Sequence, residues 1–195
     1  MKPILFIDLD NVVYDTVSTI KTLYDEDFCL YDDWVDIPVE KIKSYNFTEL
    51  KLLTEERLNE YFCSGRFFDA LNYIEGSESS IRTLNSYKEF PVMFASIGTH
   101  ENIKGKKDWV QGFNKVWSAN AGFIGVHSFD KSEINMSGGI LIDDELKNLN
   151  SSNADIKICF GDYEWNKEWT GLRAKNWKEV NKLIYEEAKK YESKD

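Results

Sequence analysis

Two apolar segments that lie far apart in the sequence each end in a pair of carboxylates. The segment FIDLD brings Asp8 and Asp10, and the segment GILIDD brings Asp143 and Asp144. A short β-branched run that ends in polar side chains is typical of a buried strand, and parallel strands present their carboxyl ends at one edge of a sheet. Four carboxylates at one edge repel one another, by roughly 4 kcal/mol per contacting pair at intermediate dielectric. The sequence therefore predicts a bound cation among them, and Mg²⁺ suits such oxygen ligands.

The composition is that of a folded protein with an acidic surface. Of the 195 residues, 42% are hydrophobic and 14% are aromatic, which is enough to bury the core of one domain with a modest insertion. The net charge of −10 argues against binding to nucleic-acid polymers. A small anionic substrate stays open, because local cations act within a screening length of about 8 Å.

Cysteine and histidine are too few for several kinds of site. Cys29, Cys63 and Cys159 have no CxxC spacing, which argues against a disulfide framework and against a zinc cluster. With His100 and His127 as the two histidines, a Ser-His-Asp triad is hard to assemble. The first apolar run is too short for a signal sequence or a membrane span. We therefore expect a cytoplasmic protein that does not contact a membrane and whose catalysis depends on carboxylates.

The apolar pattern predicts an α/β fold. Short runs typical of strands occur at residues 3–8, 91–96, 124–128, 139–143 and 156–160. Helical spacing of apolar residues predicts helices at 103–117 and 176–191. Strands that alternate with helices predict a Rossmann-like core of three layers, in which helices cover both faces of a mainly parallel sheet.

The stretch from residue 15 to residue 85 interrupts this alternation. It is far longer than one crossover helix requires, so it predicts a small helical cap inserted after the first strand. Its expected helices cover residues 15–30, 54–63 and 77–87, with Thr54 and Ser77 as N-caps. The catalytic core would then consist of residues 1–14 and 86–195, and the cap of residues 15–85 would set substrate specificity.

The acids at the end of the first strand have a spacing that suits phosphoryl transfer. A carboxylate that attacks phosphorus forms an aspartyl-phosphate, which divides one difficult hydrolysis into two easier steps. Asp8 is placed for that role, and Asp10, two residues later on the same side of the strand, could act as general acid and base. An ammonium such as that of Lys131, together with magnesium, would offset the developing negative charge.

Four motifs follow one another in a known order. They are DLDNVV, Ser96 at the end of PVMFAS, Lys131 in FDKSEI, and IDD at 142–144. This order is similar to that of the haloacid dehalogenase (HAD) superfamily of phosphatases. The Lys-rich segment KGKKDWV, and FGDYEWNK followed by RAKNWKEV, resemble more narrowly the 5'(3')-deoxyribonucleotidase family, the cytosolic type C 5'-nucleotidases. The resemblance covers most of the predicted core.

The resemblance implies a role for each of these core residues. Asp8 would be the nucleophile and Asp10 the general acid and base. The magnesium ligands would be Asp8, Asp10 through its backbone carbonyl, and Asp144. The phosphate would be bound by Ser96, Lys131 and Lys106, with Lys107 competing for the last position. Asp143 would orient Lys131 or a metal-bound water.

The resemblance also implies a substrate class and leaves its details open. Substrates would be deoxyribonucleoside monophosphates. Thr16, Tyr45, Asn46 and Phe47 lie roughly where the family binds the base, and aromatic faces and an Asn amide suit that task. The first motif has Asn11 where the family usually has Gly, and residues 97–98 replace Ser-Pro-like residues. These departures concern the substrate rather than the phosphoryl chemistry.

Other functions remain as alternatives. The same site could hydrolyse another small phosphate, such as a sugar phosphate. A receiver-type phosphoacceptor has its acid pair and its lone acceptor in a different order and carries no large insertion. A catalytically silent binding protein would be marked by loss of Asp8 or Asp10, and both are present. The sequence leaves a homodimer open.

Overall fold

A six-stranded parallel sheet forms the centre of the molecule. The computed structural model describes residues 2–86 and 90–192. The strand order is β3-β2-β1-β4-β5-β6, and every neighbouring pair is parallel. The strands are β1 (Leu5–Ile7), β2 (Val92–Ile97), β3 (Gly122–Val126), β4 (Ile140–Asp143), β5 (Ile156–Phe160) and β6 (Leu172–Ala174). The five predicted runs correspond to β1–β5, whereas β6 was not predicted.

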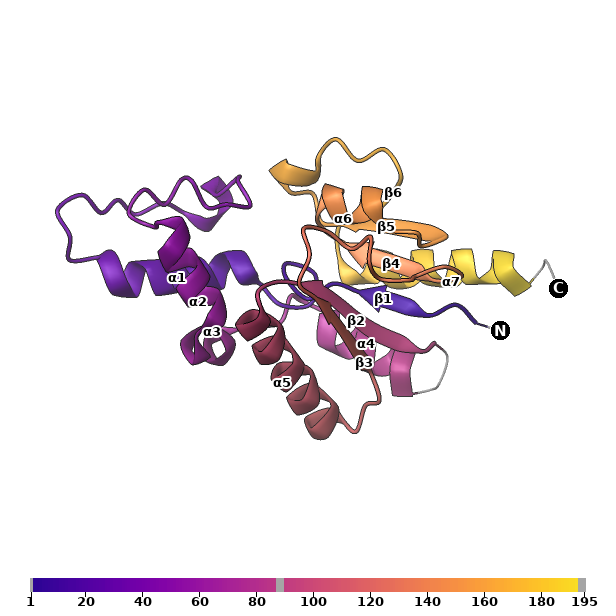
Figure 1. Cartoon of the computed structure of the whole chain (residues 1–195). Helices are drawn as coiled ribbons and strands as arrows, with labels where there is room; N and C mark the ends of the chain where they lie inside the picture. The colour runs from indigo at the N-terminus through magenta and orange to yellow at the C-terminus, as the bar shows by residue number, and fades with distance from the viewer. Residues whose placement is uncertain (1, 87–89, 193–195) are drawn as a thin grey trace.

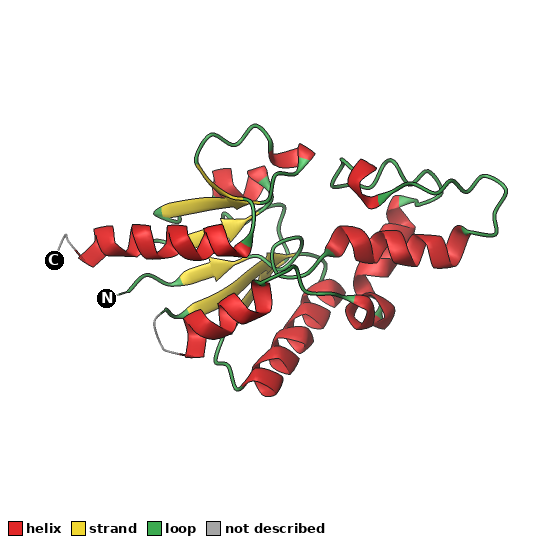
Figure 2. Cartoon of the chain, turned by 180° about the vertical axis from the view of Figure 1, so that it is seen from behind, coloured by secondary structure: helices red, strands yellow, loops and turns green. Residues whose placement is uncertain are grey.

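Helices cover both faces of the sheet, so the predicted Rossmann-like α/β core is confirmed (Figures 1 and 2). Alternate side chains along β1 enter two separate apolar clusters, Leu5 and Ile7 on one face and Phe6 on the other. The first cluster is closed by α4 (Ser77–Ser86), α5 (His100–Trp117) and α7 (Trp177–Glu192). The second is closed by α6 (Leu146–Ser151) and by Ile134 and Met136 of the preceding loop.

The cap extends from one end of the sheet (Figure 1). Its helices are α1 (Thr16–Phe28), α2 (Glu55–Cys63) and α3 (Gly65–Ala70), with the short 3₁₀ turn η1 (Val39–Lys41). Asp15 caps α1 by accepting from the Ser18 amide at 2.9 Å. Thr54 caps α2 as predicted, accepting from the Arg57 amide at 3.1 Å. Both caps satisfy backbone donors that a helix start leaves free.

The third predicted cap helix lies against the core. Helix α4 packs on β2 and α7, which are core elements. Its contacts therefore assign it to the core, whereas the boundary expected at residue 85 puts most of it in the cap. Ser77 is its first residue rather than its N-cap, and the Ser77 hydroxyl donates to the Val13 carbonyl at 2.7 Å. Residue 87 of the predicted helix, and residues 1, 87–89 and 193–195 of the predicted core, lie outside the described residues.

Two short segments connect the cap to the core, and they are hydrogen-bonded to each other. The Asp15 amide donates to the Asn72 carbonyl and the Ile74 amide to the Val13 carbonyl, each at 2.9 Å. Gly76 follows with a φ of +79°, a conformation that glycine adopts without strain. These bonds hold the two crossings between cap and core side by side. Within the described ranges, no helix is both long and apolar enough to span a bilayer.

Candidate active site

The four predicted acids meet at the carboxyl edge of the two central strands. Asp8 directly follows β1, and Asp143 ends the neighbouring strand β4. The Asp8 amide donates to the Ile142 carbonyl at 2.9 Å, which continues the pairing of β1 and β4 up to the acids. Carboxylate oxygens of Asp8, Asp143 and Asp144 lie within 4.8 Å of one another. The strand order therefore produces the convergence that the sequence predicted.

Lys131 lies between two of these carboxylates. It comes from the loop after β3, it is fully buried, and its Nζ donates to Asp8 Oδ1 and to Asp143 Oδ2, each at 2.5 Å. The other oxygen of Asp143 accepts from the Asn148 amide nitrogen at 3.2 Å and from the Glu145 backbone amide at 2.9 Å. Both carboxylate oxygens of Asp143 thus accept hydrogen bonds, and Asp143 in turn fixes the position of the Lys131 ammonium.

A second buried lysine occupies the other side of the site. Lys106 of α5 donates to Asp10 Oδ2 at 2.5 Å and to the Ser96 hydroxyl at 2.8 Å. Lys107, its competitor in the sequence, is exposed. The Thr16 hydroxyl donates to the remaining oxygen of Asp10 at 2.9 Å. Asp10, Ser96 and Lys106 therefore form one contiguous group, and Thr16 orients Asp10 from the first turn of the cap.

The site carries more negative than positive charge. Burial raises the pKa of Asp8 to about 7, although Lys131 opposes the change, and Asp143 and Asp10 add to it. Burial, and then the neighbouring Asp143 carboxylate, raises the pKa of Asp144 well above its ordinary value. The pKa of Lys131 is raised despite burial because Asp143 and Asp8 stabilise its charge. Two ammonium groups thus leave the four carboxylates incompletely compensated.

The carboxylates suit a divalent cation with oxygen ligands. Asp143 has both oxygens engaged by protein donors. Within residues 2–86 and 90–192, by contrast, Asp8 accepts through Oδ1 alone and Asp144 through Oδ2 alone. Each of these two residues keeps one oxygen for a metal ion, which fits the predicted pair of side-chain ligands. The unbalanced charge favours the same conclusion, because a bound cation would relieve it.

A loop that the sequence analysis did not assign to the site holds Asp144 in place. The 3₁₀ turn η2 (Glu164–Asn166) places the Trp165 indole 3.1 Å from Asp144 Oδ2, to which it donates. The Asn166 side chain donates to the Asp144 carbonyl at 2.9 Å. Arg173 in turn donates to the Asn166 side-chain oxygen at 2.7 Å. The sequence signal for this loop was weak, because a tryptophan in a polar loop more often marks partial burial.

A small cavity opens beside Asp10, between the cap and the core. Its volume is about 160 Å³, and Lys106 and Glu145 line it from the core. Tyr45 lines it from the cap and meets the Trp165 ring edge-on at 6.0 Å between ring centroids. Burial, followed by the carboxylates of Asp10 and Asp144, raises the pKa of Tyr45 well above its ordinary value. The Tyr45 hydroxyl therefore lies in the field of the Asp10 and Asp144 carboxylates.

Two of the predicted cap residues lie away from this cavity. Phe47 is 2% exposed and packs in the main apolar cluster, with a φ of +54° that turns the chain inward. Asn46 is exposed and lines neither this cavity nor the larger one described below. Of the four residues predicted for the substrate pocket, the structure brings Thr16 to Asp10 and Tyr45 to the cavity.

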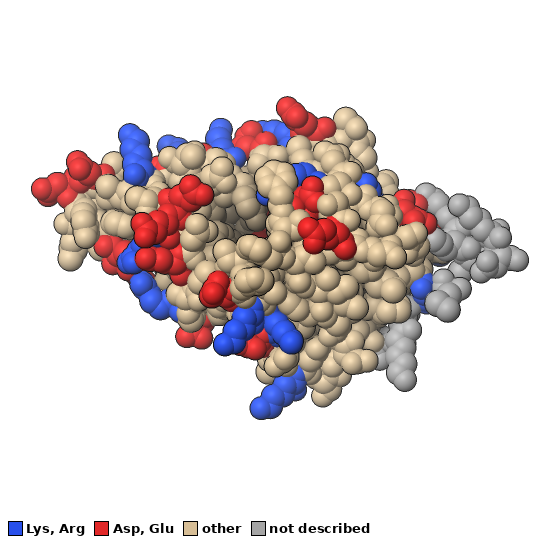
Figure 3. Space-filling view, viewed as in Figure 1, with Lys and Arg blue, Asp and Glu red and all other residues tan. Residues whose placement is uncertain are grey.

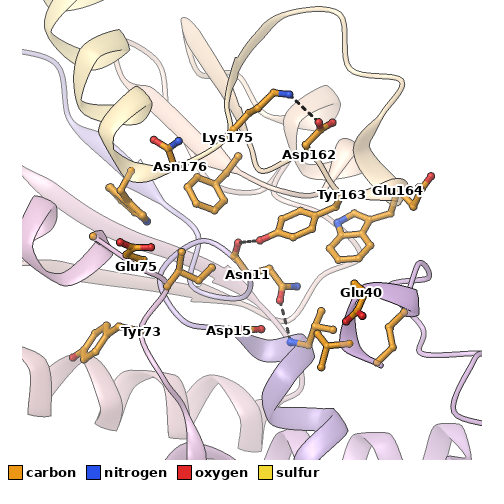
Figure 4. A pocket seen from close by; sticks show the side chains of 18 of the residues that line it. Asn11, Asp15, Glu40, Tyr73, Glu75, Asp162, Tyr163, Glu164, Lys175 and Asn176 are labelled. Atoms are coloured by element: carbon orange, nitrogen blue, oxygen red, sulfur yellow. Dashed lines mark hydrogen bonds and ion pairs between the residues drawn. The ribbon is translucent and has the colours of Figure 1, made fainter. Parts of the chain in front are cut away.

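A second, larger cavity of about 840 Å³ lies beside the two segments that connect the cap to the core (Figure 4). Asn11 borders it with a φ of +51°, a left-handed conformation that glycine adopts without strain. The Tyr163 hydroxyl donates to the Asn11 carbonyl at 3.0 Å, and the Asn11 side chain accepts from the Val17 amide (Figure 4). These bonds fix the turn that follows Asp10.

In the space-filling view the surface is hollowed between cap and core, and charges of both signs are interspersed over it (Figure 3).

A comparison with family models decides the family. Residues 2–191 match the family described as 5' nucleotidase, deoxy (pyrimidine), cytosolic type C protein. The chain belongs to this family. The resemblance drawn from the sequence motifs is therefore confirmed over nearly the whole chain. No curated protein matches the chain significantly.

Solved structures of HAD proteins share the fold. A predicted phosphatase from Clostridium acetobutylicum gives a TM-score of 0.66 at 18% identity, covering 95% of this chain and 99% of that one. A HAD-superfamily hydrolase, subfamily IA, from Geobacter sulfurreducens gives 0.60 at 11% identity, covering 94% and 96%. A HAD family hydrolase from Deinococcus radiodurans, with bound phosphate and sodium, gives 0.52 at 12% identity, covering 95% and 96%. Together with the family match, these likenesses make this protein a phosphatase of the HAD type.

Proposed function

We propose that the protein is a magnesium-dependent phosphomonoesterase that hydrolyses deoxyribonucleoside monophosphates through an aspartyl-phosphate. The observation that carries the proposal is the pairing of each catalytic acid with its own buried lysine. Asp8 is paired with Lys131, and Asp10 with Lys106, which also contacts Ser96. Nucleophile, general acid and phosphate-binding groups are thus separate and pre-oriented, as catalysis by electrostatic preorganisation requires.

In the first step, an oxygen of Asp8 attacks the phosphorus atom and the bond from phosphorus to the ester oxygen breaks. The leaving oxygen takes a proton from Asp10, so the free alcohol departs and Asp10 becomes a carboxylate. Lys131, held by Asp143, and Lys106 with Ser96 stabilise the charge on the phosphoryl oxygens. The Thr16 hydroxyl keeps Asp10 oriented toward the leaving group.

In the second step, a water molecule attacks the phosphorus atom of the aspartyl-phosphate. Asp10 accepts a proton from that water, and the bond between phosphorus and Asp8 breaks to release inorganic phosphate. Both acids then return to their starting states. Asp10 acts as the acid in the first step and as the base in the second, because the proton that it gives up in the first step is replaced by one from water.

Magnesium would be held by Asp8 and Asp144, with the backbone carbonyl of Asp10 as a further ligand. It would supply a positive charge that reduces repulsion between the carboxylate nucleophile and the phosphate. A distant relative of the same fold, the Deinococcus radiodurans hydrolase, holds phosphate and sodium. That observation supports an ion and a phosphate binding together in this fold.

The family description supports the substrate class and the location. It names a deoxy, pyrimidine nucleotidase of cytosolic type, and we extend these terms to this protein. The aromatic ring of Tyr45 at the cavity provides a face on which a base can stack. The leaving nucleoside would then lie between Asp10 and the cap.

The size of the cavity favours a second candidate, a sugar phosphate. At about 160 Å³ the cavity is smaller than the roughly 300–1,000 Å³ of pockets that take drug-sized ligands. An apolar cavity of about 150 Å³ in another protein holds a single benzene ring. A cavity of this size accommodates one ring, and a nucleoside has two, so its second ring would extend out of the cavity.

Phosphate release from a panel of substrates tests the proposal. The panel contains deoxyribonucleoside and ribonucleoside monophosphates and sugar phosphates, each with magnesium and with a chelator, beside an Asp8→Asn variant. Magnesium-dependent turnover of deoxyribonucleotides that disappears in the variant is the expected result. Turnover of sugar phosphates alone would keep the mechanism and replace the substrate, and no turnover at all would refute the proposed activity.

A further inference from the structure

We propose that Glu145 and Asn148 select the leaving group, by accepting hydrogen bonds from donors on a substrate ring bound in the small cavity. This inference rests on the proposed function, because it assigns the part of the substrate that lies beyond the phosphate. Both side chains line the cavity beside Asp10 and Lys106. Neither residue was among the predicted site residues.

Each of the two residues has a buried oxygen without a donor. Glu145 Oε2 and Asn148 Oδ1 are shielded from water and have no hydrogen-bond partner among the residues that the structure describes. Asn148 as a whole is only 4% exposed. A buried polar atom without a partner costs about 1–3 kcal/mol. Because both unpaired oxygens belong to side chains that line one cavity, we take a ligand as the source of the missing donors.

The orientation of the Asn148 amide follows from its other contact. Its Nδ2 donates to Asp143 Oδ1 at 3.2 Å, and an ionised carboxylate can only accept. The amide oxygen must therefore point away from Asp143 and remains an acceptor. Since Asp143 also holds Lys131, Asn148 links the substrate cavity to the phosphate-binding group.

In the described part of the chain the Glu145 carboxylate accepts no hydrogen bond, although the charge of Lys147 acts on it. Glu145 is the N-cap residue of α6, yet its side chain makes no capping hydrogen bond, and glutamate is not a preferred residue there. The nearby Lys147 forms no ion pair with it in the described part of the chain. The Lys147 ammonium instead lies over the rings of Tyr45, at 6.0 Å, and Phe129, at 4.9 Å. The carboxylate is thus left for a ligand.

Two unpaired acceptors, on Glu145 and Asn148, decide which rings this part of the cavity prefers. A ring that carries hydroxyl or amino groups satisfies both oxygens, whereas a ring without donors leaves them buried and unpaired. A site built to hydrogen-bond a substrate group rejects analogues that lack the group far more strongly than an apolar pocket rejects a methylene. The donor could come from a sugar hydroxyl or from an amino group of the base, and the two sources can be distinguished experimentally.

Binding of nucleosides to the magnesium-loaded protein, measured by calorimetry, tests the inference without requiring turnover. Thymidine is compared with 3'-deoxythymidine, which lacks the 3'-hydroxyl and keeps the 5'-hydroxyl, and deoxycytidine with deoxyuridine, which lacks the amino group. We expect at least a 10-fold weaker affinity for the poorer member of one pair, and that pair identifies the donor. Equal affinities within both pairs, or no binding of any nucleoside, would overturn the inference.

Variants at position 145 separate recognition from a structural role. Glu145→Met removes the acceptor at similar length and is expected to reduce the discrimination to within about 2-fold, whereas Glu145→Gln retains an acceptor and part of the discrimination. Glu186→Met, at an exposed position on α7, is the control and should discriminate like the unmodified protein. Discrimination that persists in Glu145→Met would contradict the inference.

Turnover of 4-nitrophenyl phosphate distinguishes the inference from the proposed function. Its leaving group offers no donor, so the kcat/KM of Glu145→Met on this compound should stay within about 3-fold of the unmodified protein. A loss as large as that on nucleotides would assign Glu145 to the phosphoryl site and overturn the inference. If the unmodified protein releases no phosphate from any ester, the proposed function fails, and nucleoside binding still decides the role of Glu145.

Discussion

Replacing Asp8 by asparagine should stabilise the metal-free protein at alkaline pH while abolishing catalysis. The pKa of Asp8 is about 7, against an ordinary value of 3.8. A pKa that is higher by about 3, at about 1.4 kcal/mol per unit, corresponds to a cost of about 4 kcal/mol for keeping this carboxylate ionised in the folded state. Asparagine resembles the protonated carboxyl in shape and avoids this cost.

The pH dependence follows from the same pKa. Below pH 3.8 Asp8 is protonated in both the folded and the unfolded state. Between pH 3.8 and about 7 the unfolded chain loses a proton that the folded protein keeps, so the free energy of unfolding falls as the pH rises. Above pH 7 the full penalty applies. The advantage of Asp8→Asn should therefore grow from near zero at pH 4 to about 4 kcal/mol at pH 8.

Thermal unfolding in chelator, at pH 5 and at pH 8, measures this effect. A difference of about 4 kcal/mol in a chain of this size raises the midpoint by about 10 °C. Magnesium should raise the midpoint of the unmodified protein and have little effect on the variant, which lacks one ligand. A variant that is less stable at pH 8, or a difference that does not depend on pH, would refute the reasoning.

Three further changes probe the surroundings of the site. Lys131→Met leaves two carboxylates facing each other without their cation, so chemical denaturation should show a loss of about 3–5 kcal/mol; an unchanged midpoint would contradict this. Trp165→Phe removes a hydrogen bond to Asp144, so the magnesium concentration for half-maximal turnover should rise about 10- to 100-fold; an unchanged value would refute the role. Gly105→Ala would bring its Cβ within 2.2 Å of the Phe68 ring on the cap, so KM should rise as the cap is displaced; unaltered kinetics would argue against this contact.

The core could be predicted from the sequence because its signals are local and strong. Each of the strands β1–β5 is a short apolar run, and their order along the chain determines which ends meet at one edge. Strand β6 was missed because Leu172, Arg173 and Ala174 form no apolar run and pair with one neighbour at the sheet edge. Its place is set by Arg173, which ties the strand to the loop that supports Asp144.

The cap side of the site could not be predicted in the same way. Phe47 and Asn46 lie in a long segment with little regular structure, where tertiary contacts rather than periodicity decide which side chain turns inward. Glu145 and Asn148 follow the acid pair in what looks like the polar start of a helix. Only their unpaired oxygens distinguish them from ordinary helix residues, and that distinction requires the folded structure.

The most direct test of the central claim is to detect a phosphoryl group on Asp8. The protein, with magnesium, is mixed with 4-nitrophenyl phosphate, quenched in acid within one turnover, and digested for mass spectrometry. The same measurement on Asp10→Asn should show more of the intermediate, because hydrolysis of the aspartyl-phosphate needs the base while nitrophenolate leaves without an acid. We expect the phosphoryl group on Asp8 and nowhere else. Phosphate release without any phosphorylated Asp8 in either protein would contradict the account.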